Sequence, residues 1–108
     1  MSRSEILFRL EATLRERKNA VAGSSYVASL YAKGLDAVLK KVGEEATEAI
    51  LAAKGDDKLH LTKEAADLLF HTLVMLAAKD VALADVLAEL ERREGTSGLD
   101  EKESRPDK

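Results

Sequence analysis

Two short acidic stretches decide how this chain folds. The first reads Lys40-Lys41-Val42-Gly43-Glu44-Glu45-Ala46-Thr47-Glu48, and the second reads Glu64-Ala65-Ala66-Asp67. Each places two carboxylates three residues apart, and on an α-helix that spacing puts both side chains on one face. Two such helices facing each other bring four carboxylates to one point, where they repel unless a cation lies between them. The two stretches therefore predict a divalent-metal site between two helices, with Lys40 and Lys41 beside it for an anionic substrate.

The surrounding apolar residues recur with the period of a helix. They predict helices over 4–18, 35–54, 58–79 and 83–94. Ser4 is a candidate cap for the first helix, and a short helical turn near Tyr26 is expected within the irregular stretch 19–34. Gly55-Asp56-Asp57 ends the second long helix and caps the third. We expect an all-α bundle of four to five helices.

The helix predicted over 58–79 is apolar on almost every side. Such a helix is normally buried. In a chain of 108 residues, one layer of neighbouring helices hardly covers it. The sequence therefore predicts a homodimer or larger assembly with this helix at its centre.

Composition excludes several other classes of protein. The chain contains no cysteine, so disulfides, thiolate metal sites and cysteine nucleophiles are absent, as is compatible with a reducing cytoplasm. A net charge of −3 argues against nucleic-acid binding. The most apolar stretch, 68–78, is shorter than the roughly 20 residues needed to span a membrane. We expect a cytoplasmic domain over residues 1–94 and a flexible charged tail over 95–108.

The acidic residues have a plainer interpretation, because glutamates on a helix surface are usually solvated. The second pair, however, lies on a helix with little other polar surface, where burying an uncompensated charge costs several kcal/mol. Carboxylate ligands favour Mg²⁺ or Mn²⁺. His71 is close enough in sequence to reach such a site, or else it forms hydrogen bonds in the core.

The chemistry left open is metal-assisted attack of water on a phosphoanhydride. No GxxxxGK loop and no Ser/His/Asp arrangement is present. A carboxylate such as Glu44 or Glu48 could act as the base. Lys40 and Lys41, joined by Lys33, could bind phosphate, or the lysine pair could simply form ion pairs with Glu44 and Glu45.

These residues resemble the phosphoribosyl-ATP pyrophosphohydrolase family. The resemblance spans roughly residues 4–95 and includes Ser25-Tyr26, Lys33-Gly34-Leu35 and Asp85-Val86-Leu87-Ala88-Glu89-Leu90 in addition to the acidic stretches. The carboxylate pattern alone marks the wider MazG-like superfamily of all-α nucleotide pyrophosphohydrolases. The resemblance implies a MazG-like dimer of helical bundles and Mg²⁺-dependent cleavage of phosphoribosyl-ATP between its α and β phosphates. This reaction gives phosphoribosyl-AMP and pyrophosphate in the second step of histidine biosynthesis.

The resemblance also implies roles for individual residues. Glu45, Glu48, Glu64 and Asp67 correspond to metal ligands, and Glu44 assists as a further ligand or through the attacking water. Lys41, Lys40 and Lys33 correspond to phosphate-binding residues, and Ser25 and Tyr26 to the lining of the substrate pocket. Many relatives are fused to a zinc-dependent phosphoribosyl-AMP cyclohydrolase, which we expect here on a separate chain.

Two alternatives remain. One is a house-cleaning enzyme of the same superfamily that cleaves dNTPs. The other is a helical dimerisation module without chemistry.

Overall fold

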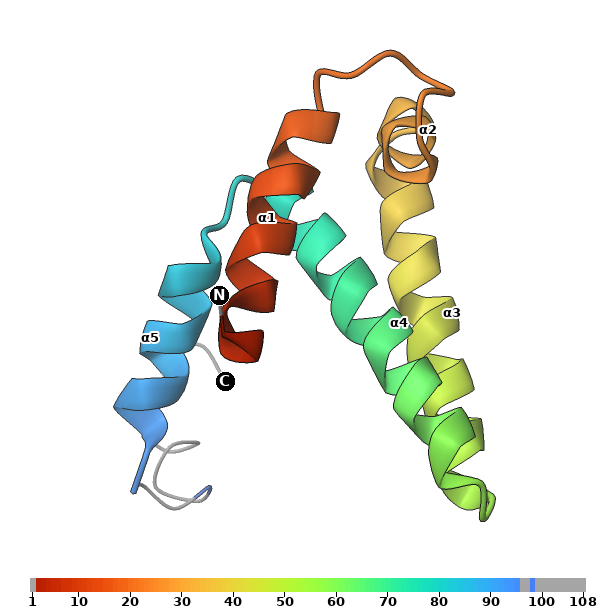
Figure 1. The fold of residues 1–108 in the computed structure, drawn as a ribbon, viewed down its shortest axis with the longest axis vertical. Helices are drawn as coiled ribbons and strands as arrows, with labels where there is room; N and C mark the ends of the chain where they lie inside the picture. The colour runs from red at the N-terminus through yellow and green to blue at the C-terminus, as the bar shows by residue number, and fades with distance from the viewer. Residues whose placement is uncertain (1, 96–97, 99–108) are drawn as a thin grey trace.

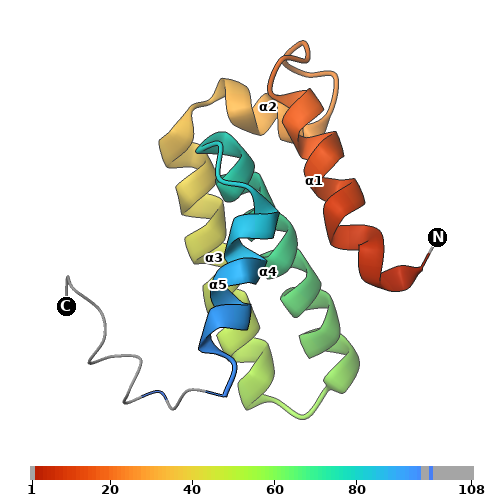
Figure 2. The ribbon, with the colours of Figure 1, turned by 90° about the vertical axis from the view of Figure 1, so that its left-hand side faces the viewer.

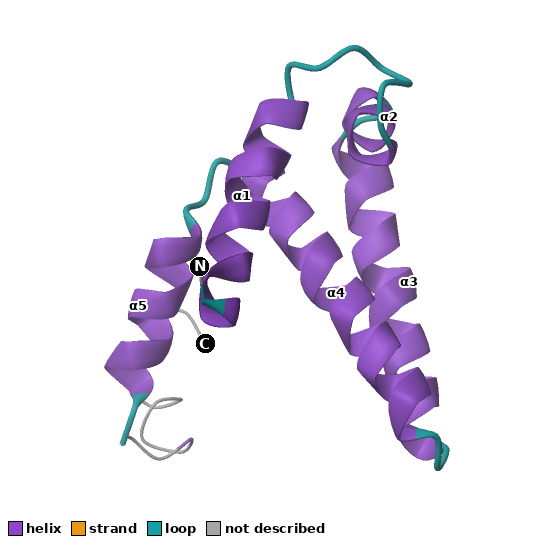
Figure 3. Cartoon of the chain, in the orientation of Figure 1, coloured by secondary structure: helices purple, strands orange, loops and turns teal. Residues whose placement is uncertain are grey.

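The computed structural model describes residues 2–95 and 98, and every regular element among them is helical (Figures 1 and 3). A short 3-10 helix, η1 (Arg3–Glu5), leads into α1 (Ile6–Arg17). The remaining elements are α2 (Tyr26–Ala32), α3 (Leu35–Lys54), α4 (Lys58–Ala78) and α5 (Leu83–Arg93). The predicted all-α class with four to five helices is therefore confirmed.

The α3–α4 hairpin is the central element of the fold. The two helices run antiparallel and pack against each other along most of their length (Figures 1 and 2). Gly55 ends α3, and the Asp57 side chain accepts a hydrogen bond from the backbone N–H of His60 at 3.1 Å. This N-cap satisfies one of the unpaired amides at the start of α4. The predicted turn and its cap are confirmed.

The hydrophobic core lies at one end of this hairpin, where α4 finishes. Leu14 of α1, Val38 of α3 and Val74 of α4 are its largest fully buried side chains, and α2 adds Val27 and Leu30. Burying a valine or leucine side chain contributes about 1.5–3 kcal/mol. The core therefore fastens α1 and α2 to one end of the hairpin and leaves the other end free (Figure 1).

The helix ends at this core are capped by side chains from distant positions. Glu11 of α1 accepts a hydrogen bond from the backbone N–H of Leu83 at 2.8 Å, and so supplies the cap that Ala82 cannot provide. Lys18 donates to the Ala77 carbonyl at 2.9 Å and to the Asp80 carboxylate at 2.7 Å. Both contacts fix the turn between α4 and α5 against α1.

The predicted capping role of Ser4 is wrong. Residues 3–5 form η1, so Ser4 lies inside a turn, and Glu5 holds the N-cap position of α1. The Ser4 hydroxyl instead lies 2.9 Å from that of Ser2.

The helices form an inverted V rather than a closed bundle (Figure 1). The hairpin is one arm, and α1 and α5 form the other; a view turned by 90° shows α1 and α5 diverging (Figure 2). Large apolar side chains consequently stay exposed in the single chain, among them Leu61 and Leu69 of α4 and Leu90 of α5. The predicted burial of α4 is met only on the sides that face α1 and α3.

The structure bears only partly on two expectations from the sequence, namely the absence of a membrane span and the flexible C-terminal tail. No helix in the described part of the chain is long and apolar enough to cross a membrane. The expected tail, 95–108, lies outside the described residues apart from residues 95 and 98, and the domain boundary at 94 therefore stays a prediction.

Candidate active site

Three of the predicted carboxylates meet between α3 and α4. Glu45, Glu48 and Glu64 each offer an oxygen, and these oxygens lie within 4.8 Å of one another. The hairpin explains the meeting, because Glu48 lies seven residues before Gly55 and Glu64 seven residues after Asp57. At 1.5 Å per residue, both lie about 10 Å from the turn on facing helices. The i, i+3 spacing then places Glu45 beside Glu48 on the same face.

The group is short of hydrogen-bond partners. Glu45 is buried, with 6% of its surface exposed, and its Oε2 has no partner among the described residues. Glu64 Oε1 is likewise buried without a partner there. The second oxygen of each of these two carboxylates has a partner. Lys41 Nζ lies 3.4 Å from Glu45 Oε1, and His60 Nε2 lies 3.4 Å from Glu64 Oε2. Buried carboxylate oxygens without partners are costly, and a divalent cation between them would remove that cost.

The crowding also changes the protonation of Glu48. A hydrogen bond with Glu45 raises the pKa of the Glu48 carboxyl above its usual range, and the charges of Glu45 and Glu64 and partial desolvation raise it further. Lys41 opposes the shift. The cluster thus favours holding a positive charge, either a proton or a metal ion.

The two neighbouring lysines face different surroundings. Lys41 lies 3.7 Å from Glu44 Oε1 as well as 3.4 Å from Glu45 Oε1, so its ammonium belongs to the carboxylate cluster. Lys40 lines an open hollow of about 680 Å³ along α3, together with Glu44, Thr47 and Glu48. Glu48 borders both the hollow and the cluster. The hollow therefore adjoins the carboxylate cluster through Glu48.

Serine and tyrosine at the start of α2 have separate contacts. Ser25 caps α2 by accepting a hydrogen bond from the Ala28 backbone N–H at 3.0 Å. The Tyr26 hydroxyl lies 2.8 Å from His71 Nε2. Ser25 thus stabilises the N-terminus of α2, and the Tyr26 side chain connects α2 to α4 through His71.

Two further predicted residues, Asp67 and Lys33, are not part of the group of three carboxylates. Asp67 lies one turn after Glu64 on α4, but its side chain is exposed and outside the group of three close carboxylates. Lys33 follows the last residue of α2, also exposed. Their roles as metal ligand and phosphate-binding residue stay predictions.

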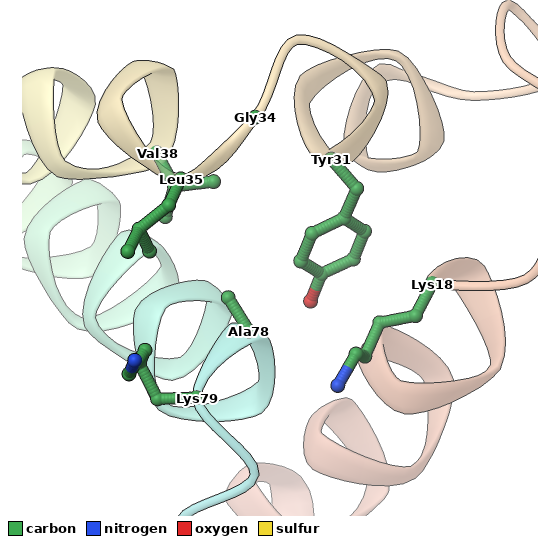
Figure 4. Close-up of a pocket in the computed structure, with 7 residues that line it drawn as sticks. All are labelled: Lys18, Tyr31, Gly34, Leu35, Val38, Ala78 and Lys79. Atoms are coloured by element: carbon green, nitrogen blue, oxygen red, sulfur yellow. The ribbon is translucent and has the colours of Figure 1, made fainter.

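A second cavity lies away from the acidic cluster. It measures about 310 Å³ and lies between Lys18 after α1, Tyr31 of α2, Val38 of α3 and Lys79 after α4 (Figure 4). Figure 4 shows the Tyr31 ring pointing into the gap between α1 and α4. Burial raises the pKa of the Tyr31 phenol, while Arg15 opposes that shift. None of its lining residues was predicted as a site residue from the sequence, although Gly34 and Leu35 belong to a stretch that carries the family resemblance.

Comparison with known proteins bears directly on the acidic cluster. A family model described as phosphoribosyl-ATP pyrophosphohydrolase matches residues 7–94, which contain every site residue discussed above. The chain belongs to the phosphoribosyl-ATP pyrophosphohydrolase family. The resemblance drawn from the acidic stretches is thereby confirmed.

Individual members of the phosphoribosyl-ATP pyrophosphohydrolase family are similar over nearly their whole length. A phosphoribosyl-ATP pyrophosphatase of Dinoroseobacter shibae is 61% identical over 100 residues, covering 93% of this chain and 98% of the relative. One from Aromatoleum aromaticum is 59% identical over 101 residues, covering 94% of each. One from Novosphingobium aromaticivorans is 58% identical over 105 residues, covering 97% and 98%.

Proposed function

We propose that this chain hydrolyses phosphoribosyl-ATP to phosphoribosyl-AMP and pyrophosphate, the second step of histidine biosynthesis. The observation that carries the proposal is the meeting of Glu45, Glu48 and Glu64 beside Lys41, with two buried carboxylate oxygens left without partners among the described residues. Family membership supports the choice of substrate, because the relatives are named for it.

The carboxylates suit a hard divalent cation. Glu45, Glu48 and Glu64 would hold Mg²⁺, with Asp67 as a fourth ligand from the next turn of α4 and Mn²⁺ as a substitute. When bound, Mg²⁺ supplies charge neutralisation at the phosphate oxygens and acidifies water. The two unpartnered oxygens, on Glu45 and Glu64, are the atoms that fit this assignment.

The chain's own residues bind the phosphates and move the proton. Lys41 is oriented by Glu44 and Glu45 and contacts the phosphate at the cluster, while Lys40 neutralises charge from the hollow and Lys33 adds a cation from the end of α2. The water oxygen forms a bond to the α phosphorus, and the bond to the bridging oxygen breaks, so that pyrophosphate leaves. Glu44, or Glu48 with its raised pKa, accepts the proton of the attacking water.

A homodimer completes this site in our proposal. Among the residues that the structure describes, only α3 lines the hollow, so its opposite side is open there. Large apolar side chains on α3, α4 and α5 stay exposed in the single chain, and exposed apolar residues gathered on one surface are typical of interaction sites. A second copy packed into the V would cover them and bring the hollow against a partner. Ser25 and Tyr26 at the start of α2 would line the pocket near the phosphates.

The proposed reaction also sets a cellular context. The expected compartment is the cytoplasm, where a separate phosphoribosyl-AMP cyclohydrolase would consume the product. Nucleic acid and membrane lipid are not expected partners.

Product analysis tests the proposed function. Purified protein with Mg²⁺ is incubated with phosphoribosyl-ATP, ATP and the dNTPs, with and without a chelator. Pyrophosphate and phosphoribosyl-AMP formed from phosphoribosyl-ATP, and lost on chelation, are the expected result. Equal or faster cleavage of dNTPs would favour the house-cleaning alternative. Folded protein that releases no pyrophosphate from any nucleotide would favour a non-catalytic dimerisation module.

A further inference from the structure

Gly43 is a glycine in the interior of a long helix. It lies eight residues after the start of α3, and glycine is the least favourable residue in a helix interior apart from proline. The backbone does not need a glycine there, because Gly43 has the conformation of the helix and is not among the glycines with positive φ. The position therefore carries a residue that weakens α3 without a conformational reason.

Packing within the chain does not require glycine at this position either. A Cβ atom added to Gly43 would meet no heavy atom within 4 Å among the described residues, apart from its immediate neighbours in the helix. The buried residues Glu45 and Ala52 follow Gly43 by two and nine positions, which places them on the opposite side of α3. A side chain at position 43 would thus fit in the single chain, and the fold gives no reason for its absence.

The space above Gly43 belongs to the hollow along α3. The hollow measures about 680 Å³, a volume typical of small-molecule sites, and the residues that line it with Gly43 are Lys40, Glu44, Thr47 and Glu48. Glycine at such a position lets a ligand approach the helix backbone closely. The helix surface between Lys40 and Thr47 therefore offers a flat contact area to a ring.

The polar groups around Gly43 are mainly hydrogen-bond acceptors. Glu44 and Glu48 carry carboxylates one helical turn apart. The Thr47 hydroxyl donates its proton to the Gly43 carbonyl at 3.1 Å, so towards a ligand it can only accept. Among the lining residues, Lys40 supplies one positive charge against the two carboxylates. Such a lining suits an uncharged group with several hydroxyl donors better than it suits a phosphate.

We propose that the hollow is a ribose subsite: the sugar ring lies on Gly43, and its vicinal hydroxyls donate to Thr47 and to the neighbouring carboxylates. The hollow adjoins the carboxylate cluster through Glu48, so a ribose bound there lies next to phosphates bound at the cluster. The inference rests on the proposed function, whose substrate carries a ribose on its α phosphate. Gly43 and Thr47 are then specificity-determining residues that select nucleotides with sugar hydroxyls.

A second copy of the chain is the competing occupant of the space above Gly43. Leu39 and Ile50 lie four positions before and seven positions after Gly43, on the same side of α3, with exposed fractions of 41% and 63%. A glycine there could let a partner helix approach closely. This explanation predicts that a larger residue at position 43 breaks the dimer and leaves nucleotide selectivity unchanged. The charged lining of the hollow favours the sugar over an apolar helix surface.

AMP and 2′,3′-dideoxy-AMP are the probes for the ribose subsite. AMP has the α phosphate and the ribose of the proposed product, and the dideoxy analogue lacks both hydroxyls. Calorimetry with Mg²⁺ measures the two affinities. We expect the wild type to bind AMP about tenfold more tightly, because the analogue leaves hydrogen-bond acceptors unpaired. Inorganic pyrophosphate, which has no sugar, is the reference ligand for the carboxylate cluster.

Two variants change the ribose subsite and leave the carboxylates in place. Gly43→Leu fills the space under the sugar, so AMP and dideoxy-AMP should bind alike. The variant should fold, because leucine favours a helix and the space is open. Thr47→Val removes one acceptor and keeps the shape of the side chain, so the preference for AMP should fall about threefold. The affinity for pyrophosphate with Mg²⁺ should be unchanged in both variants.

Thr62→Val is the matched control. Thr62 is an exposed residue of α4 whose hydroxyl donates to the Lys58 carbonyl at 2.8 Å, the same type of contact that Thr47 makes with Gly43. Neither Thr62 nor Lys58 lines the hollow. The preference for AMP should be unchanged in this variant, although the same hydroxyl has been removed from a helix.

The outcomes separate the ribose subsite from its alternatives. Wild-type protein that binds dideoxy-AMP as tightly as AMP, or that does not bind AMP, would overturn the subsite. A Gly43→Leu protein that keeps the preference but sediments as a monomer would place Gly43 in the dimer interface instead. Wild-type protein that releases pyrophosphate from phosphoribosyl-ATP without a preference for AMP would refute only the subsite. A preference for AMP without any hydrolysis would refute only the proposed function.

Discussion

Glu64 of α4 brings a carboxylate oxygen within 4.8 Å of one from Glu45 of α3, and each residue also buries an oxygen without a partner among the described residues. Two like charges at this separation weaken the hairpin unless a cation joins them. If the proposed metal site is correct, the metal-free protein should therefore be less stable than the metal-bound protein, and this difference can be measured.

Metal binding should raise the melting temperature of the wild-type protein. At a Mg²⁺ concentration of about 100 times Kd, binding adds about 2.7 kcal/mol of stability, which corresponds to a rise on the order of 10 °C for a domain of this size. Glu45→Gln should lose most of this rise, and without metal it should be at least as stable as wild type because a repulsion has been removed. Thermal melts with and without Mg²⁺ measure both effects.

Glu16→Gln serves as the control, since Glu16 is an exposed residue of α1 far from the cluster in sequence. It should show the full Mg²⁺-dependent rise. A Glu45→Gln variant with an equally large rise would show that the metal binds elsewhere.

Glu11 should matter for stability although it lies outside the site. Its carboxylate accepts the hydrogen bond from the Leu83 amide and is 3.6 Å from Arg15. Glu11→Ala should destabilise the protein by about 1 kcal/mol, as does the loss of a helix cap. Urea unfolding measures the change, and hydrogen exchange at Leu83 should accelerate. If Glu16→Ala costs as much as Glu11→Ala, the cap is not the cause.

The ion pair between Lys18 and Asp80 should contribute stability only above acidic pH. A hydrogen bond from Lys18, followed by the charge of the same lysine, lowers the pKa of the Asp80 carboxyl. A carboxyl with a depressed folded pKa stabilises the protein above its unfolded value, about 3.9, and loses this contribution as pH falls through the folded value. The stability difference between wild type and Asp80→Asn should therefore be constant near neutral pH and vanish in strong acid.

Asparagine suits this test because residue 80 has a φ of 58°, a left-handed conformation that asparagine tolerates. Urea unfolding of both proteins from pH 7 down to pH 2 measures the difference. A difference that is the same at both ends would mean that the ion pair does not stabilise the fold.

The exposed apolar face of α4 should mediate self-association. Leu61 and Leu69 lie eight residues apart, which places them about 80° apart around the helix and within one broad face. Their exposed fractions are 36% and 55%. Replacing both by lysine should shift the protein from dimer towards monomer in sedimentation experiments. Val21→Lys is the control, because Val21 is 79% exposed in the α1–α2 loop. A double variant that sediments like wild type would exclude this face from the interface.

Local patterns were enough to predict most of the fold. Helical periodicity gave α3 at its observed bounds, and Asp57 was identified as a cap because that task depends on residues three positions away. The cap of α5 was not predictable, since Glu11 reaches Leu83 across 72 positions. The prediction for Ser4 was wrong for a related reason. Serine is a favourable N-cap residue, but here the 3-10 helix already begins at Arg3, so Ser4 lies inside it.

In the candidate site, too, some residues could be placed from local sequence patterns and others could not. Glu45, Glu48 and Glu64 could be assigned because their spacing and a short hairpin turn determine where they meet. The contact between Tyr26 and His71 depends on how α2 packs against α4, which no local pattern encodes. The same dependence separates Lys41, which joins the cluster, from Lys40, which lines the hollow.

The most direct test of the proposed metal-dependent hydrolysis is the rate of pyrophosphate release from phosphoribosyl-ATP with Mg²⁺ by Glu64→Gln, compared with wild type at equal helix content. Losing a metal ligand removes several kcal/mol of transition-state stabilisation, so the rate should fall on the order of a hundredfold or more. A folded Glu64→Gln protein that releases pyrophosphate at the wild-type rate would contradict the assignment of the cluster as the catalytic centre.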